Sequence, residues 1–223
     1  PDDPTTAGTL DALGAALRDQ GRLEEALPLF EAGLARQIRR FGASHPRVAV
    51  SLHNLAFLHD RSGRREEARR LHARALDIRL ATLGAEHRAT ANSHHNLATT
   101  LRAMGRYLEA EESYARALSI RRAQLREGHP QIALSVIGLG TNLLYAGRPD
   151  DAESLLREGL EMRETIFPEH HPQVVDTRVT LAGALTALGR YEEAEGYLLP
   201  AYRTLRETLG TQDVRNQAAA GRV

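Results

Sequence analysis

Apolar residues recur at helical spacing along the chain, in stretches that end at a glycine. Over residues 47–61 the apolar positions lie three or four residues apart, at Val48, Leu52, Leu55 and Leu58. This spacing places them on one face of an α-helix. Gly63 follows the stretch, where a glycine suits the left-handed backbone just past a helix end. The pattern therefore predicts a helix over residues 47–61 that stops before Gly63.

A second helix is predicted directly after this glycine. Glu66 and Glu67 stand at its start, where acidic groups interact favourably with the N-terminal end of the helix dipole. The stretch runs to about Thr82 and is ended by Leu83 and Gly84. Two helices joined by so short a turn form an antiparallel hairpin.

This hairpin pattern occurs five times with a fixed period of 42 residues. A Gly-Arg pair marks each turn, at Gly21-Arg22, Gly63-Arg64, Gly105-Arg106, Gly147-Arg148 and Gly189-Arg190. Eight residues before each glycine the chain has Leu, and five residues after it has Ala. A constant period of this length indicates one structural unit that is copied and stacked on its neighbours. The chain is therefore predicted to be all-α, a right-handed α-solenoid of stacked helix hairpins.

The repeats are expected at residues 4–45, 46–87, 88–129, 130–171 and 172–213, within a single array that covers residues 1–223. Their starts are marked by His-Pro at residues 45–46, 129–130 and 171–172. Proline at the first turn of a helix loses no hydrogen bond. Residues 214–223 continue the register as half of a sixth repeat, and Asp3-Pro4 resembles a junction left by an upstream repeat. We therefore expect a fragment of a longer protein.

Composition limits the classes of partner. The formal net charge is +0, so no strong field attracts nucleic acid or an anionic membrane. Cysteine is absent, and no apolar run approaches the ~20 residues of a membrane span. All 29 basic residues are Arg, for which codon usage is the simpler explanation and a preference for guanidinium chemistry the alternative. We expect a cytoplasmic protein that binds neither nucleic acid nor membrane.

The sequence contains no pattern typical of catalysis or of cofactor binding. It has no phosphate-binding Gly-x-x-x-x-Gly-Lys-Ser/Thr, no Gly-x-Ser-x-Gly and no His-Glu-x-x-His. Four histidines, one at each repeat junction, are too far apart to share an ion. The cluster of His53, His94 and His95 lacks a Cys and a suitably spaced carboxylate. We therefore expect no enzyme activity, no cofactor and no metal.

The repeated columns resemble those of the tetratricopeptide repeat, in the 42-residue form found in kinesin light chain. The matching strings are Ser-Leu-His-Asn-Leu-Ala at 51–56, Ala-Leu-Asp-Ile-Arg at 75–79 and Leu-Gly-Ala-Glu-His at 83–87. A HEAT-type array is the alternative fold, but the Gly-x-x-x-x-Ala spacing argues against it. The resemblance implies a superhelix whose first helices line a concave groove. Bacteria place similar arrays beside protein kinase and nucleotide-hydrolase domains.

The resemblance implies that Asn54 and Asn96 contact the backbone of an extended peptide, because peptide-binding arrays carry Asn in this column. An amide offers both a donor and an acceptor. The alternative is that both residues hydrogen-bond to neighbouring helices. The same column holds Ala12, Gly138 and Thr180 in the other copies, so a clamp is expected on repeats two and three.

Further groove residues are expected around these two asparagines. On repeats two and three they are His53, Phe57, Asp60, Arg61, Asn92, His95, Thr99 and Arg102. A more apolar stretch is expected from Leu134, Ile137, Thr141, Tyr145 and Val179. Together they favour a ligand that is polar at one end and apolar at the other. The alternative is that these side chains pack on neighbouring repeats or lie at solvated helix ends.

The sequence therefore predicts a non-catalytic scaffold that binds a protein or peptide partner. One alternative is the regulatory repeat region of an upstream enzyme, such as a serine/threonine protein kinase or NTPase, in contact with its own catalytic domain. Another is a structural spacer that self-associates.

Overall fold

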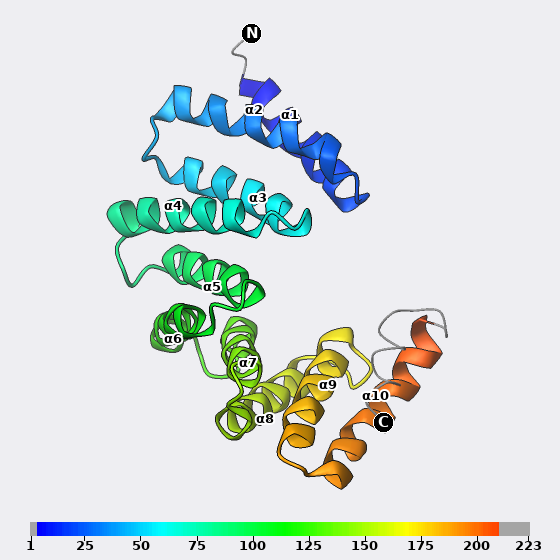
Figure 1. Cartoon of the computed structure of the whole chain (residues 1–223). Helices are drawn as coiled ribbons and strands as arrows, with labels where there is room; N and C mark the ends of the chain where they lie inside the picture. Colours follow the sequence, from blue (N-terminus) through cyan, green and yellow to red (C-terminus); the bar gives the residue numbers. More distant parts are fainter. Residues whose placement is uncertain (1–3, 210–223) are drawn as a thin grey trace. The chain divides into compact units, whose positions relative to one another are not determined.

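The computed structural model describes residues 4–209, and in this range the backbone forms ten α-helices and no strand (Figure 1). They are α1 (Pro4–Asp19), α2 (Leu23–Phe41), α3 (Pro46–Arg61), α4 (Arg65–Leu83), α5 (Arg88–Ala103), α6 (Tyr107–Gln124), α7 (Pro130–Tyr145), α8 (Pro149–Ile166), α9 (Pro172–Ala187) and α10 (Tyr191–Leu209). The predicted all-α succession of helix pairs is confirmed. The half-repeat expected at 214–223 lies outside the described residues.

The helices belong to two compact units, which divide after Ile120 near the end of α6. In the first unit, α1 packs against α2, α2 against α3, α3 against α4, and α4 against α5. In the second unit, α7 to α10 do the same. Within each unit, the two helices of a hairpin thus pack against each other and against the adjacent hairpin of the same unit, as the repeat pattern predicts.

The hairpin turns explain the invariant spacing of the glycines. The five turn glycines have φ between 76° and 78°, a left-handed backbone that other residues rarely adopt. A Cβ atom at these positions would meet nothing within 4 Å, so the backbone conformation rather than crowding requires glycine. In four turns the following Arg pairs with the acidic residue three positions later: Arg22–Glu25, Arg106–Glu109, Arg148–Asp151 and Arg190–Glu193.

The junction histidines act as N-caps of the first helices. The Nδ1 atoms of His45, His87, His129 and His171 accept from the backbone N–H two residues later, at 3.0 to 3.2 Å. The cap satisfies one of the donors that a helix start leaves open. The junction at His87, which has no proline after it, is capped in the same way.

Adjacent repeats are joined by an arginine staple, whose arginine is buried in two copies and partly buried in the third. In three copies a second-helix Arg donates both to a backbone carbonyl ten residues later and to a hydroxyl fourteen residues later, over 2.6 to 3.2 Å. The donor and hydroxyl pairs are Arg79–Ser93, Arg121–Ser135 and Arg163–Thr177. Burial lowers the pKa of the Arg121 guanidinium to about 10. The recurring Ser/Thr column is thus an acceptor for the preceding repeat.

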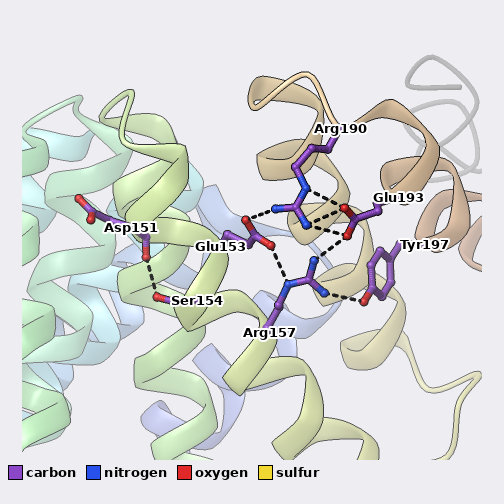
Figure 2. A network of polar contacts seen from close by, with 7 residues as sticks. All are labelled: Asp151, Glu153, Ser154, Arg157, Arg190, Glu193 and Tyr197. Atoms are coloured by element: carbon purple, nitrogen blue, oxygen red, sulfur yellow. Dashed lines mark hydrogen bonds and ion pairs between the residues drawn. The ribbon is translucent and has the colours of Figure 1, made fainter.

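A network of charges links α8 and α10 within the second unit (Figure 2). Arg157 donates to Glu153 at 2.7 Å and to Glu193 at 2.9 Å, and Arg190 reaches the same two carboxylates at 2.6 and 2.7 Å. Arg157 also donates to the hydroxyl of Tyr197 at 3.1 Å. Two guanidinium groups thus alternate with two carboxylates and fix the relative position of the two helices.

Candidate functional site

Six of the residues expected to contact a ligand lie on one stripe of the first helices α3 and α5. The stripe takes the positions thirteen, nine, six and two residues before each turn glycine, which share one helix face. We define the first-helix stripe as Val50, Asn54, Phe57 and Arg61 of α3 with Asn92, Asn96, Thr99 and Ala103 of α5. All eight side chains are exposed or partly exposed. Val50, which is 51% exposed, was not predicted from the sequence. Its repeat position could have indicated it, because the fourth repeat has the predicted residue Leu134 at the same position.

Hydrogen bonds between α3 and α5 make this stripe continuous within the first unit. Asn96 Nδ2 lies 3.0 Å from His53 Nδ1, and the Thr100 hydroxyl donates to Asp60 Oδ2 at 2.6 Å. Because an amide nitrogen only donates, His53 must accept through an unprotonated Nδ1. The pKa of His53 is lowered by burial and then by the charges of Arg79 and Arg18, which keeps this imidazole neutral.

The two asparagines of the expected clamp differ in their surroundings. Asn96 donates one N–H to His53, and its Oδ1 and second N–H can still form hydrogen bonds with a ligand. This is the contact with a neighbouring helix that the sequence left open as the alternative. The amide of Asn54 makes no hydrogen bond within the described residues and is partly exposed. Both N–H donors and the acceptor oxygen of Asn54 can therefore form hydrogen bonds with a ligand.

A buried polar cluster lies beneath the stripe. His72 takes the position where other repeats have Phe30, Tyr114, Leu156 or Leu198, and its ring centroid is 5.3 Å from that of His53. Burial, reinforced by the charge of Arg79, lowers the pKa of His72 to about 3. The 3.8 Å contact of its Nε2 with Asp60 Oδ2 is therefore a contact of a neutral ring rather than an ion pair.

Among the described residues, the Asp60 carboxylate accepts one hydrogen bond in this cluster, from the Thr100 hydroxyl. Its Oδ1 is buried and has no hydrogen-bond partner among the described residues. Burial raises the pKa of Asp60, although the hydrogen bond from Thr100 works in the opposite direction. The predicted groove residue Asp60 is thus partly buried, with its side chain 25% exposed, and it contacts Thr100 of α5.

The remaining predicted residues of the first unit belong to the stripe or lie next to it on α3 and α5. Thr99 lies on it, and its hydroxyl is 3.0 Å from the hydroxyl of Tyr114, whose ring is met edge-on by His95. Phe57 is 41% exposed, with the Arg18 guanidinium 5.7 Å from its ring centroid. Arg61 is exposed and forms no ion pair with any described residue. Arg102 is half-buried.

The apolar residues expected further on belong to the second unit. Leu134 and Tyr145 are 40% and 57% exposed on α7, and Thr141 lies between them on the same face. Ile137, in contrast, is buried in the core against Gly159, and Val179 packs on the same core cluster. For these two residues the packing alternative describes the structure. The expectation of one ligand bridging both stretches stays a prediction.

Within residues 4–209, no group of three or more His, Asp or Glu side chains is arranged to hold a metal ion. None of the described helices is long and apolar enough to cross a membrane.

A tetratricopeptide repeat family model matches residues 5–81, 61–123 and 89–165, and a second tetratricopeptide repeat model matches residues 143–203. The chain belongs to the tetratricopeptide repeat family. The predicted fold type is therefore confirmed against the HEAT-type alternative. Proteins built from this repeat are generally non-catalytic scaffolds. The family match supports this general description and does not specify a ligand.

Solved structures place the array close to kinesin light chain repeats. The kinesin light chain-type, nearly identical TPR-like repeats of Podosopora anserina are 26% identical over 93% of this chain and 98% of theirs, with a TM-score of 0.76. BtubC (BKLC) from P. vanneervenii is 22% identical over 95% and 85%, with a TM-score of 0.78.

A third solved structure is a Rap protein complexed with Competence and Sporulation Factor. It is 16% identical over 96% of this chain and 61% of its own, with a TM-score of 0.72. At this identity, as for BtubC, the likeness shows the fold alone. No curated protein matched the chain.

Proposed function

We propose that this array is a non-catalytic scaffold that binds an extended segment of a partner protein along the first-helix stripe of repeats two and three. The observation that carries the proposal is the pairing of an unengaged amide, Asn54, with exposed apolar side chains on the same helix face. A peptide backbone presents one donor and one acceptor at every residue, and an amide side chain complements both. Val50 and Phe57 would accept apolar side chains on either side of it.

The two asparagines would contribute differently to this binding. Asn54 offers both of its N–H groups and its oxygen. Asn96 is oriented by His53, so its Oδ1 remains available as an acceptor for a backbone N–H of the ligand. His53 thus acts as a positioning residue, and Arg61 supplies a cation at the end of the stripe.

A Rap protein of the same fold has been solved in complex with Competence and Sporulation Factor. That likeness supports a binding role for the fold and leaves the ligand of this chain to experiment. We further propose that the protein is cytoplasmic, without nucleic-acid or membrane partners, and that it carries no catalytic residues.

Selection from a random peptide library tests the proposal. We expect the parent chain to enrich a peptide class that the Asn54→Ala/Asn96→Ala variant binds at least about tenfold more weakly, as the loss of two or more hydrogen bonds predicts. Thr180→Ala is the matched control, because it changes the same column in the fifth repeat. Circular dichroism checks that all three proteins stay helical. Equal binding by the folded double variant, or no enrichment at all, would remove the clamp.

A further inference from the structure

The junction between α2 and α3 carries a concentration of positive charge that the repeat fold does not require. Residues 32–59 contain four arginines and no acidic residue. Three of them, Arg39, Arg40 and Arg47, are exposed and form no ion pair or side-chain hydrogen bond within the described residues. Together with Phe41 and His45 we call them the junction cluster.

The cluster is organised around one aromatic ring. The guanidinium carbons of Arg40 and Arg47 lie 5.1 and 5.0 Å from the centroid of Phe41, and His45 stacks on the same ring at 4.7 Å. Because both guanidinium groups are held to one ring, they cannot lie more than about 10 Å apart. Acidic side chains two residues apart on an extended peptide are separated by about 7 Å. Neighbouring carboxylates of one acidic segment can therefore reach both.

The other copies of the repeat show what the fold itself needs at these positions. At the columns of Arg39, Arg40 and Arg47, the next three junctions have Ala81, Thr82 and Ala89; Ala123, Gln124 and Gln131; and Thr165, Ile166 and Gln173. None of these nine residues is charged. Codon usage explains why basic residues are arginines, but it does not explain why three columns that are neutral at the next three junctions are all basic here.

A role in stabilising the end of α2 does not account for the three charges either. Cations near a helix C-terminus interact favourably with its dipole, and Arg39 and Arg40 lie in the last turn of α2. However, α4 ends at Gly84 with the same backbone hydrogen bond that Gly42 makes, and its last turn has no basic residue. In α6, the basic residues of the last turn are Arg121, which is the staple, and Arg122, which pairs with Glu158.

We infer that the junction cluster is a docking site for an acidic segment of a partner protein. Arginine forks bind carboxylates in two-point geometry, and three unpaired forks match a short run of Asp or Glu. The positive patch is short, because the next junction contains Glu86, which already pairs with Arg116. A nucleic acid, with phosphates spaced continuously along its length, would need a row of cations that continues beyond one junction. The site is separate from the first-helix stripe.

Fluorescence anisotropy with a dye-labelled oligoglutamate peptide tests the inference. The key variant is Arg39→Ala/Arg40→Thr/Arg47→Ala, which copies the α4–α5 junction of the same chain and should therefore fold. The charge-matched control is Arg65→Ala/Arg74→Ala/Arg88→Ala, which removes three other exposed arginines of the first unit. We expect the junction variant to bind at least about tenfold more weakly, the control to lose about twofold, and the affinity to fall with salt.

Three results would overturn the inference: an equal loss in both triple variants, no binding of oligoglutamate by the parent chain, or tighter binding of oligothymidylate than of oligoglutamate. A gain-of-function variant adds a positive test. Ala81→Arg/Thr82→Arg/Leu83→Phe/Ala89→Arg transfers the cluster to the next junction and should add a second bound peptide per chain. The Asn54→Ala/Asn96→Ala variant should keep oligoglutamate binding, so failure of the stripe and failure of this site are distinguishable.

Discussion

Protonation of His72 should destabilise the first unit in acid. A histidine has a pKa near 6.5 when unfolded, and burial lowers that of folded His72 to about 3. Between these values the unfolded chain binds a proton that the folded protein does not bind. The free energy of unfolding attributable to His72 therefore falls by about 1.4 kcal/mol for each pH unit below 6.5. Near pH 4.5 the loss relative to pH 7.5 is roughly 2 to 3 kcal/mol.

The matched variant is His72→Leu, because Leu156 and Leu198 take this position in the fourth and fifth repeats. Asp60 keeps its hydrogen bond from Thr100 in this variant, so the raised pKa of Asp60, which favours the folded state in acid, affects both proteins. Urea unfolding, followed by circular dichroism at both pH values, gives the difference. We expect the variant to lose about 2 to 3 kcal/mol less than the parent on acidification.

Nuclear magnetic resonance of the imidazole provides an independent measurement. The His72 resonance should not titrate until the pH falls well below 5. The reasoning is refuted if His72→Leu shows the same loss of stability in acid as the parent chain, or if the His72 resonance titrates near pH 6.5. Either result would mean that the folded protein accommodates the imidazolium, through the nearby Asp60 carboxylate.

Three further predictions concern the packing, the staple and the caps. Gly159→Ala places a Cβ 2.2 Å from Ile137 Cγ1, so it should lower the free energy of unfolding, measured by thermal unfolding, by about 1 to 3 kcal/mol. Gly196→Ala is the matched control, because its Cβ would meet nothing within 4 Å. It should raise the stability of α10 by about 0.5 to 1 kcal/mol. Arg121→Leu removes the donor to the Gln131 carbonyl and the Ser135 hydroxyl, so it should lower the free energy of unfolding in urea by about 2 to 4 kcal/mol. Ser135→Ala, which removes one of the two hydrogen bonds, should cost about 1 kcal/mol. An equal or smaller loss in Arg121→Leu than in Ser135→Ala would contradict the role of the staple. His87→Ala should lower stability by about 1 kcal/mol and His87→Asn should restore it, since asparagine is a good N-cap; equal melting temperatures for all three proteins would show that the cap contributes nothing.

The helices, turns and register could be predicted from the sequence because each depends on local spacing that the period repeats five times. Gly63 requires only its own backbone angle, and the helix predicted over residues 47–61 begins one residue earlier in the structure, at Pro46. The stripe was predictable for the same reason, since helical spacing alone places Asn54 and Phe57 on one face.

The contacts between helices could not be predicted in this way. The bond between Asn96 and His53 depends on the approach of two helices that are 43 residues apart in the chain. The burial of Ile137 depends on Gly159, whose missing side chain leaves the space that Ile137 fills. The staple could have been predicted from the sequence by comparing pairs of repeat positions. In three copies, an Arg of the second helix is followed fourteen residues later by a Ser or Thr of the next first helix.

Among the four junctions between the described repeats, the staple is missing at one, and this has a consequence for the order in which the array opens. The staple column of the first repeat has Gln37, whose buried Oε1 has no partner among the described residues, and the hydroxyl opposite belongs to Ser51. In a linear array each hairpin is held only by its neighbours, so opening starts at the weakest coupling. The α1–α2 hairpin should therefore exchange its amide hydrogens through a separate, low-energy opening and be the first part released by a protease. Gln37→Arg should merge that opening with the unfolding of the repeats behind it.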